Sequence, residues 1–401
     1  MQILRFGGTE EVKKIFLEIG VDPYGIKIML PKTDAFLIRL KGVNHVGANI
    51  LKQEMLAQGA DAAIARGSLT GNVKKTDVLL IGQSAQFKSL IAKLKLQPFG
   101  LSKLAAQLEE NIENFSRDNF TIAFRDGPLN LKTRTAIMGI INLTPDSFSQ
   151  DGLYRNFSHN YPDLALRKAL AMVTDGARII DLGGESSRPG AKKITVKEEL
   201  ARTIPAVRLL AKKIKVPISI DTTKPQVAQA AIGAGAQIIN DISGLRDKQM
   251  IKVAARCKAS VVIMHMLGRP QTMQKIISYE SLIDDITAYL KKAIDSAQAG
   301  GISPDKIIVD PGIGFGKTAQ HNLEIIKHLE VFKVLGKPIL VGPSRKSFIG
   351  KLLGSDSEDR FSGTLAACLA AAERGASILR VHDVKAVNQA LKITEGIKNA
   401  S

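Results

Sequence analysis

Short apolar runs rich in β-branched residues alternate with stretches of helical periodicity from residue 132 to the end of the chain, and each run ends in polar residues. The runs lie at 136–142, 178–182, 217–221, 237–241, 260–265, 306–310, 338–342 and 377–382. Continuously apolar strands that alternate with helices, such as those expected at 197–210 and 225–234, are typical of a parallel sheet covered by helices. Eight such units in about 270 residues predict a (β/α)8 TIM barrel.

The first 125 residues are organised differently. Their pattern predicts helices at 9–19 and 43–58, strands at 26–30, 36–40 and 76–82, and two further helices separated by 97–100. A polar segment at 111–131 contains the turn sequence Asp126-Gly127-Pro128, which is typical of a domain boundary. We therefore expect a smaller accessory α/β domain at 1–125, without a chemical motif, followed by the barrel at 126–401.

The composition narrows the class of protein. The 401 residues are 45% hydrophobic and 23% charged, which excludes global disorder. The two cysteines, Cys257 and Cys368, exclude a disulfide scaffold and a thiolate zinc site, and they fit a reducing compartment. The N-terminus lacks the apolar core of a signal peptide, and apolar runs stay well short of the roughly 18 residues that span a membrane. We expect a cytoplasmic protein without a membrane span.

The formal net charge of +18 raises the question of an anionic partner. Residues 1–130 contribute +4 (17 basic, 13 acidic) and residues 131–401 contribute +14 (39 basic, 25 acidic), with no dense basic run. The chain has no Trp and 5% aromatic residues, so a nucleic-acid-binding module on an inactive barrel is disfavoured. We expect most of this charge to be solvated and a minority to form an anion site.

Active sites of such barrels lie at the C-terminal ends of the strands. These ends carry acids, amides and cations together: Asn142, Asp181, Asp221, Asn240, Asp310, Lys346, Arg380 and His382. Partly desolvated carboxylates and an amide suit the N–H and NH2 donors of a planar heterocycle, whereas Arg and Lys suit phosphate oxygens. The glycine-rich segment 312–318 lacks P-loop spacing, and we interpret it as a turn where the backbone can approach a ligand. An enzyme is the favoured interpretation.

Eight segments, in order, resemble the signatures of the dihydropteroate synthase family. They are Met138–Ser149 (MGIINLTPDSFS), Ile180–Ala191 (IDLGGESSRPGA), Ser219–Pro225 (SIDTTKP), Ile239–Ile242 (INDI), Met264–Met266 (MHM), Asp310–Lys317 (DPGIGFGK), Ser344–Ser347 (SRKS) and Arg380–Asp383 (RVHD). The resemblance covers about residues 134–395. The chain departs from the family pattern at Gln150-Asp151, where the first loop is one residue longer, and at Pro343.

The resemblance implies an enzyme of folate biosynthesis that condenses 6-hydroxymethyl-7,8-dihydropterin diphosphate with 4-aminobenzoate, giving 7,8-dihydropteroate and diphosphate. It implies Mg2+ as the cofactor and a homodimer as the assembly. The implied pterin ligands are Asp221, Asn240, Asp310 and Lys346. The implied diphosphate ligands are Asn142, Ser187, Arg380 and His382, with Asn142 also contacting the metal. The implied aminobenzoate ligands are Arg188, Pro189, Phe315 and Ser347. The residues expected to act in catalysis are Lys346, Arg380 and His382.

One alternative shares the pterin site. A methyltetrahydrofolate:corrinoid methyltransferase-like barrel would use the same pterin contacts, but it has no need of a diphosphate site. The cations of 344–347 and 380–382 therefore favour the synthase.

Overall fold

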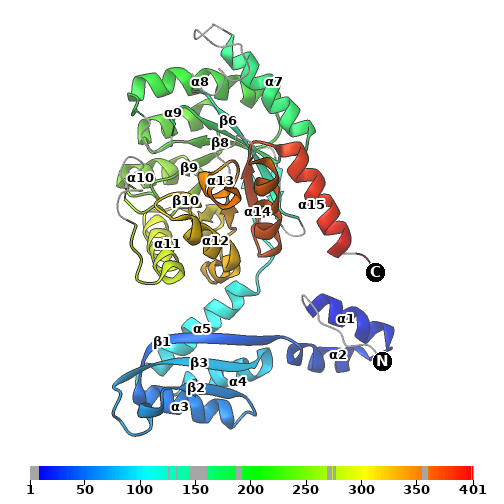
Figure 1. Ribbon diagram of the computed structural model, residues 1–401, viewed down its shortest axis with the longest axis vertical. Coiled ribbons are helices and arrows are strands. Elements are labelled where there is room, and N and C mark those ends of the chain that lie inside the picture. Colours follow the sequence, from blue (N-terminus) through cyan, green and yellow to red (C-terminus); the bar gives the residue numbers. More distant parts are fainter. Residues whose placement is uncertain are drawn as a thin grey trace. The chain divides into compact units, whose positions relative to one another are not determined.

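The structure, a computed structural model, describes residues 9–124, 127–131, 134–144, 160–186, 192–268, 273, 277–354, 360–398 and 400. The chain divides into two compact units, Met1–Glu113 and Asn114–Ser401 (Figure 1). We call them the N-terminal unit and the barrel unit, and we describe each by itself.

The N-terminal unit is built on a three-stranded antiparallel sheet with the order β1-β3-β2. Its elements are α1 (Thr9–Glu18), α2 (Pro23–Met29), β1 (Ala35–Asn44), α3 (His45–Leu56), β2 (Asp61–Ile64), β3 (Lys75–Gln83), α4 (Ser84–Leu94) and α5 (Leu101–Phe115). Its core joins one face of the sheet to α3, α4 and α5, with Leu51, Leu80 and Leu90 fully buried. Leu37 and Ile81 lie on the other face and are exposed.

One predicted strand of this unit is wrong. The apolar run at 26–30 falls in helix α2 and the 3-10 turn that follows it. Pro23 occupies the first turn of the helix, and the carboxylate of Asp22 accepts hydrogen bonds from the amides of Tyr24 and Gly25. These are helix-start signals, and here they outweigh the β-branched composition of a short run.

The barrel unit contains an eight-stranded parallel sheet with the order β11-β10-β9-β8-β7-β6-β13-β12. The strands are β6 (Ala136–Asn142), β7 (Ile179–Gly183), β8 (Ile218–Asp221), β9 (Ile238–Asp241), β10 (Ser260–Met264), β11 (Ile307–Asp310), β12 (Leu340–Val341) and β13 (Ile378–Val381). The bridge between Val309 and Ile339 joins the two outer strands and closes the sheet into a cylinder. Each predicted strand is present, and the predicted (β/α)8 barrel is confirmed.

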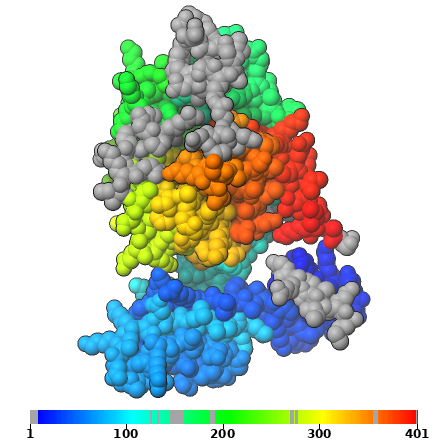
Figure 2. Space-filling model, in the orientation of Figure 1, coloured from blue at the N-terminus to red at the C-terminus, as the bar shows by residue number. Residues whose placement is uncertain are grey.

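Helices surround this cylinder. They are α7 (Tyr161–Thr174), α8 (Val196–Lys213), α9 (Pro225–Ala234), α10 (Lys248–Arg256), α11 (Leu282–Ala299), α12 (Ala319–Lys327), α13 (Ser347–Leu353), α14 (Phe361–Glu373) and α15 (Val384–Lys398). In the space-filling view, α11, α12, α14 and α15 form a continuous outer surface over the strands (Figure 2). The predicted helices at 197–210 and 225–234 correspond to α8 and α9.

A short antiparallel hairpin, β4 (Thr121–Phe124) and β5 (Gly127–Asn130), closes the N-terminal end of the cylinder. Its buried Ile122 and Leu129 pack in one cluster with the inward-facing Met138, Ile238 and Leu340. The hairpin therefore belongs to the barrel unit. For this reason the units divide after residue 113, and not after residue 125 as the turn sequence predicted.

Among the described residues, no helix combines the length and the apolar character that crossing a membrane requires.

Candidate active site

The barrel gathers the predicted polar residues at the C-terminal ends of its strands. On β8, for example, Ile218 and Ile220 pack outward against the helices, so the alternation of the strand turns Asp221 inward. The same alternation turns four other residues into the cylinder: Asn142, Asn240, Asp310 and Arg380. One end of the cylinder therefore presents acids, amides and a guanidinium toward its axis.

Arg380 lies at the centre of a buried ionic network. Its Nε donates to Oδ2 of Asp181 at 2.7 Å, and its Nη2 donates to Oδ2 of Asp221 at 2.8 Å. The amide of Asn240 also donates to Oδ2 of Asp181, at 3.3 Å. Burial lowers the pKa of Arg380, but the two carboxylates outweigh this effect and raise it. Arg380 is therefore a permanent cation.

Asp221 and Asp310, which end β8 and β11, are the two acids among the predicted pterin ligands. Burial raises the pKa of each, and the cations Arg380 and Lys346, respectively, oppose this shift. Asp310 accepts a hydrogen bond from the amide of Gly312 at 2.7 Å, which fixes one of its oxygens. Carboxylates in such surroundings gain most from a ligand that brings N–H donors to them.

The glycine-rich turn after β11 packs around Lys346. Gly312, Gly314 and Gly316 all have positive φ angles, and a Cβ on Gly314 would lie 2.7 Å from Cδ of Lys346. Nζ of Lys346 donates to the carbonyl of Ile313 and lies 4.4 Å from the centroid of the Phe315 ring. The sequence interpretation of 312–318 as a close-approach turn agrees with this geometry, in which the approaching group is a lysine side chain.

The turn also contains a second buried lysine, which sequence reasoning missed. Nζ of Lys317 lies 3.0 Å from Nδ1 of His265 and donates to the carbonyl of Phe315 at 3.0 Å. Burial lowers the pKa of Lys317 to about 7 and, with Lys317 and Arg246 nearby, that of His265 to about 2. In the sequence, Lys317 was visible only as the residue that replaces the third glycine of a G-x-G-x-x-G spacing.

His382 is held beside β12. Its Nδ1 lies 3.0 Å from Oγ of Ser344, and its backbone amide donates to the same oxygen at 3.3 Å. Burial, with help from Arg380 and Arg345, lowers the pKa of His382 to about 3. His382 is therefore a neutral hydrogen-bonding group near pH 7, although the sequence grouped it with the cations. Arg345 forms a two-point ion pair with Asp383 (3.1 and 2.7 Å).

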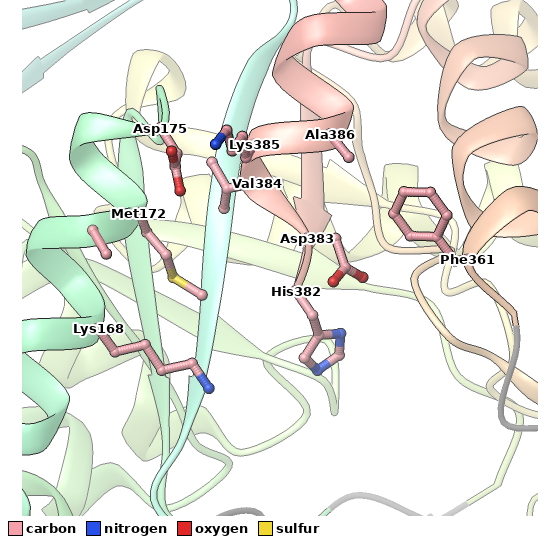
Figure 3. A pocket seen from close by; sticks show the side chains of 10 residues that line it. Lys168, Met172, Asp175, Phe361, His382, Asp383, Val384, Lys385 and Ala386 are labelled. Atoms are coloured by element: carbon pink, nitrogen blue, oxygen red, sulfur yellow. The ribbon is translucent and has the colours of Figure 1, made fainter. Parts of the chain in front are cut away.

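A pocket of about 280 Å³ opens beside His382. Lys168 and Met172 of α7 line one side of it, Phe361 of α14 lines another, and His382 and Asp383 follow β13 (Figure 3). Since His382 belongs both to this pocket and to the mouth of the barrel, the pocket adjoins the predicted diphosphate side of the site.

The remaining predicted residues divide into two groups. Ser347 begins α13, is exposed, and directly follows Lys346 in the chain. Ser187, Arg188 and Pro189, and the lengthened segment at 150–151, lie outside the described residues. Within the described part of the chain, no three His, Cys, Asp or Glu side chains are grouped so that they could hold a metal ion by themselves.

The barrel unit is similar to proteins that are already known. The family described as "Pterin binding enzyme" matches residues 138–382. The dihydropteroate synthase of Synechocystis sp. is 47% identical over 266 residues, which are 66% of this chain and 90% of the relative. The structure of Xanthomonas albilineans dihydropteroate synthase with 4-aminobenzoic acid has 38% identity and a TM-score of 0.65, and it covers 71% of this chain and 100% of that one.

A further relative extends beyond the barrel. The probable bifunctional folylpolyglutamate synthase/dihydropteroate synthase of Haloferax volcanii is 38% identical over 359 residues, which are 86% of this chain and 42% of the relative. This match is longer than the barrel unit, so it includes part of the N-terminal unit.

Proposed function

The chain belongs to the pterin-binding enzyme family, and we infer from its site that it is a dihydropteroate synthase of folate biosynthesis. It joins 6-hydroxymethyl-7,8-dihydropterin diphosphate to 4-aminobenzoate, and it releases 7,8-dihydropteroate and diphosphate. The observation that carries this assignment is the juxtaposition, at one end of a closed barrel, of inward-facing acids with Arg380 and Lys346. The relatives named above are synthases, which removes the basis for the corrinoid methyltransferase alternative.

The acids and the amide recognise the pterin ring in this proposal. Asp221 and Asp310 accept hydrogen bonds from the ring N–H and amino groups, and Asn240 bonds to a mixed donor and acceptor edge. Nζ of Lys346 then donates to a ring acceptor from its position above Phe315. A ligand without these donors would leave buried carboxylates unpaired, which gives the site its selectivity.

The diphosphate lies on the side of Arg380, His382 and Asn142 in this proposal. Arg380 supplies a fixed positive charge, and neutral His382 supplies a hydrogen bond whose direction Ser344 sets. The donor set also fits Mg2+: the amide oxygen of Asn142 is a hard ligand, and Mg2+ in such sites takes one or two protein oxygens together with phosphate oxygens and water. When bound, Mg2+ would neutralise charge on the diphosphate.

The reaction forms a bond between the arylamine nitrogen and the pterin methylene, while the methylene–oxygen bond breaks and its electron pair leaves with the diphosphate. Arg380 stabilises the charge that develops on the leaving group. The electron-rich dihydropterin, held by Asp221 and Asn240, delocalises the positive charge on the methylene. The arylamine attacks as a neutral molecule, so the site needs no strong general base, and the amine proton leaves after the bond has formed.

The second loop and the outer helices complete the proposal. Ser187 would contact the diphosphate, and Arg188, Pro189, Phe315 and Ser347 would border the aminobenzoate. A homodimer in the cytoplasm, without nucleic acid or membrane partners, stays a prediction from the sequence.

The test is product formation from pterin diphosphate and radiolabelled 4-aminobenzoate, with and without Mg2+. We expect turnover by the wild-type protein, and a loss of at least about 100-fold in Asp221→Ala and Lys346→Ala, because each change leaves buried polar groups unpaired. Lys291→Ala, on the exposed surface of α11, is the control, and circular dichroism monitors folding. Near wild-type turnover in folded Asp221→Ala would contradict the assignment.

A further inference from the structure

We propose that Asp181 is a positioning residue that holds the guanidinium of Arg380 in the orientation required for the diphosphate. The proposal rests on the proposed function, because it gives Arg380 its ligand. The sequence placed Asp181 at a strand end, but in the structure it lies in the middle of β7, one layer below the residues that would touch substrate. Its side chain is fully buried.

The geometry around Asp181 favours a role directed mainly at Arg380, because its contact with the amide of Asn240, at 3.3 Å, is the longer one. Its Oδ2 receives Nε of Arg380 at 2.7 Å and lies 2.6 Å from Nη2 of the same side chain. Two nitrogens on one edge of the guanidinium are therefore held by a single carboxylate oxygen. This contact fixes both the position and the plane of the fork, and within the described residues Nη1 makes no hydrogen bond or ion pair.

Asp181 and Asp221 hold Arg380 in different ways. Asp221 lies at the end of β8, is 16% exposed, and carries the carboxylate that the pterin would occupy. A ring that donates to Asp221 draws on the same carboxylate that neutralises Arg380. Asp181 is out of reach of such a ring because it is fully buried beneath Arg380. Asp181 is therefore the partner that keeps Arg380 in place while substrate is bound.

The sign of the electrostatic effect makes this role testable. Removal of a negative charge near an anion site strengthens anion binding if charge alone matters. If orientation matters more, the same removal weakens binding of the diphosphate ligand. Asp181→Asn preserves the shape of the side chain and removes the charge, so it separates the two cases.

Asp241 provides the matched control. It is also a fully buried carboxylate on a neighbouring part of the barrel, but its oxygens accept from the backbone amides of Ser243 and Leu245 and do not contact Arg380. Asp241→Asn therefore reports the cost of neutralising a buried barrel carboxylate. Thermal unfolding of both variants shows whether each one is folded at the assay temperature.

The experiment compares the wild type with Asp181→Asn and Asp241→Asn. Calorimetry measures how tightly each protein binds the pterin diphosphate without aminobenzoate, and how tightly it binds the pterin alcohol that lacks the diphosphate. Steady-state kinetics are measured as well. We expect Asp181→Asn to bind the diphosphate at least about 10-fold more weakly, with less than a 3-fold change for the alcohol and for the KM of aminobenzoate. Asp241→Asn should stay within 2-fold of wild type. In an Arg380→Lys background, Asp181→Asn should add less than a 3-fold loss.

Tighter or unchanged binding of the diphosphate by folded Asp181→Asn would overturn the proposal. Equal losses for the diphosphate and the alcohol, or a full additional loss in the Arg380→Lys background, would also overturn it. Failure of the proposed function gives a different result, in which the wild-type protein itself neither binds the pterin diphosphate nor forms dihydropteroate.

Discussion

Replacement of Lys224 by Ala is the most direct test of how the barrel unit tolerates buried charge. Nζ of Lys224 lies 2.6 Å from Oε2 of Glu185 and also contacts Oε2 of Glu199. Glu199 is fully buried, and its Oε1 is without a hydrogen-bond partner among the described residues. Lys224 is therefore the main compensation for a carboxylate that has no access to water.

The expected cost follows from this burial. Removing one partner of a buried ion pair costs about 3–5 kcal/mol, because the other charge remains unpaired. At about 2.1 cal/mol/K per residue, the 288 residues of Asn114–Ser401 unfold with an entropy of about 0.6 kcal/mol/K. We therefore expect the melting temperature of the barrel unit to fall by about 5–8 °C in Lys224→Ala.

The pH dependence identifies the cause of this loss. A buried carboxylate without a cation partner costs less when it is protonated, so the penalty in Lys224→Ala should grow as pH rises. The difference between variant and wild type should therefore shrink as pH falls from 7 toward 4.5. Calorimetric unfolding across this range measures it.

An exposed ion pair serves as the control. Lys291 and Asp295 lie 3.2 Å apart on α11, with about half of each side chain exposed. Lys291→Ala should cost less than about 0.5 kcal/mol at every pH. A loss below about 1 kcal/mol in Lys224→Ala, or a loss that is the same at pH 5 and pH 7, would refute the reasoning.

Three further predictions concern the turn after β11 and Lys346, which packs against it. Burial, partly offset by Asp310, lowers the pKa of Lys346 to about 8, so kcat/KM should fall as pH rises through about 8. An active Lys346→Arg variant should show this fall at a higher pH, and pH–rate profiles measure both proteins. Gly312→Ala should destabilise the protein by more than about 2 kcal/mol, because the φ of Gly312 is +74° and a Cβ would lie 1.9 Å from a backbone oxygen. Gly301→Ala is the control, since it has the φ strain alone, and denaturant unfolding compares the two variants. Burial lowers the pKa of Lys317 to about 7 in the folded state, against about 10.5 in the unfolded state, so the unfolded state binds more protons between these pH values. The free energy of unfolding should therefore rise by about 1.4 kcal/mol for each unit by which pH increases in this range. This slope should disappear in Lys317→Met.

The barrel strands were predictable because of where they lie. A strand that faces a filled cylinder on one side and helices on the other is apolar at nearly every position, so it stands out from the amphipathic helices around it. The run at 26–30 was not predictable in this way, because a run of five residues does not define a period. The evidence for helix α2 was local, in the cap at Asp22 and in Pro23.

The candidate site was predictable only in part, for a similar reason. A polar residue that ends an apolar strand is visible in the sequence, and this signal found Asp221, Asn240 and Asp310. The role of Asp181 depends on a contact with Arg380, 199 residues later in the chain, and nothing in the local pattern indicates that contact. The protonation of His382 likewise depends on burial that several strands create together.

The charge of the site predicts that both halves of the proposed substrate contribute to binding. Acids and cations balance each other at this end of the barrel: Asp181 and Asp221 form ion pairs with Arg380, and the charge of Asp310 acts on Lys346 and Lys317. Such a site has little net positive charge, so the overall charge of +18 does not by itself attract diphosphate into it. A pterin that donates to Asp221 takes over part of the carboxylate that neutralises Arg380, and the positive charge of Arg380 then acts on the diphosphate of the same molecule. We therefore expect ring recognition and leaving-group stabilisation to be coupled through one carboxylate, so that either half of the proposed substrate alone binds more weakly than the halves joined.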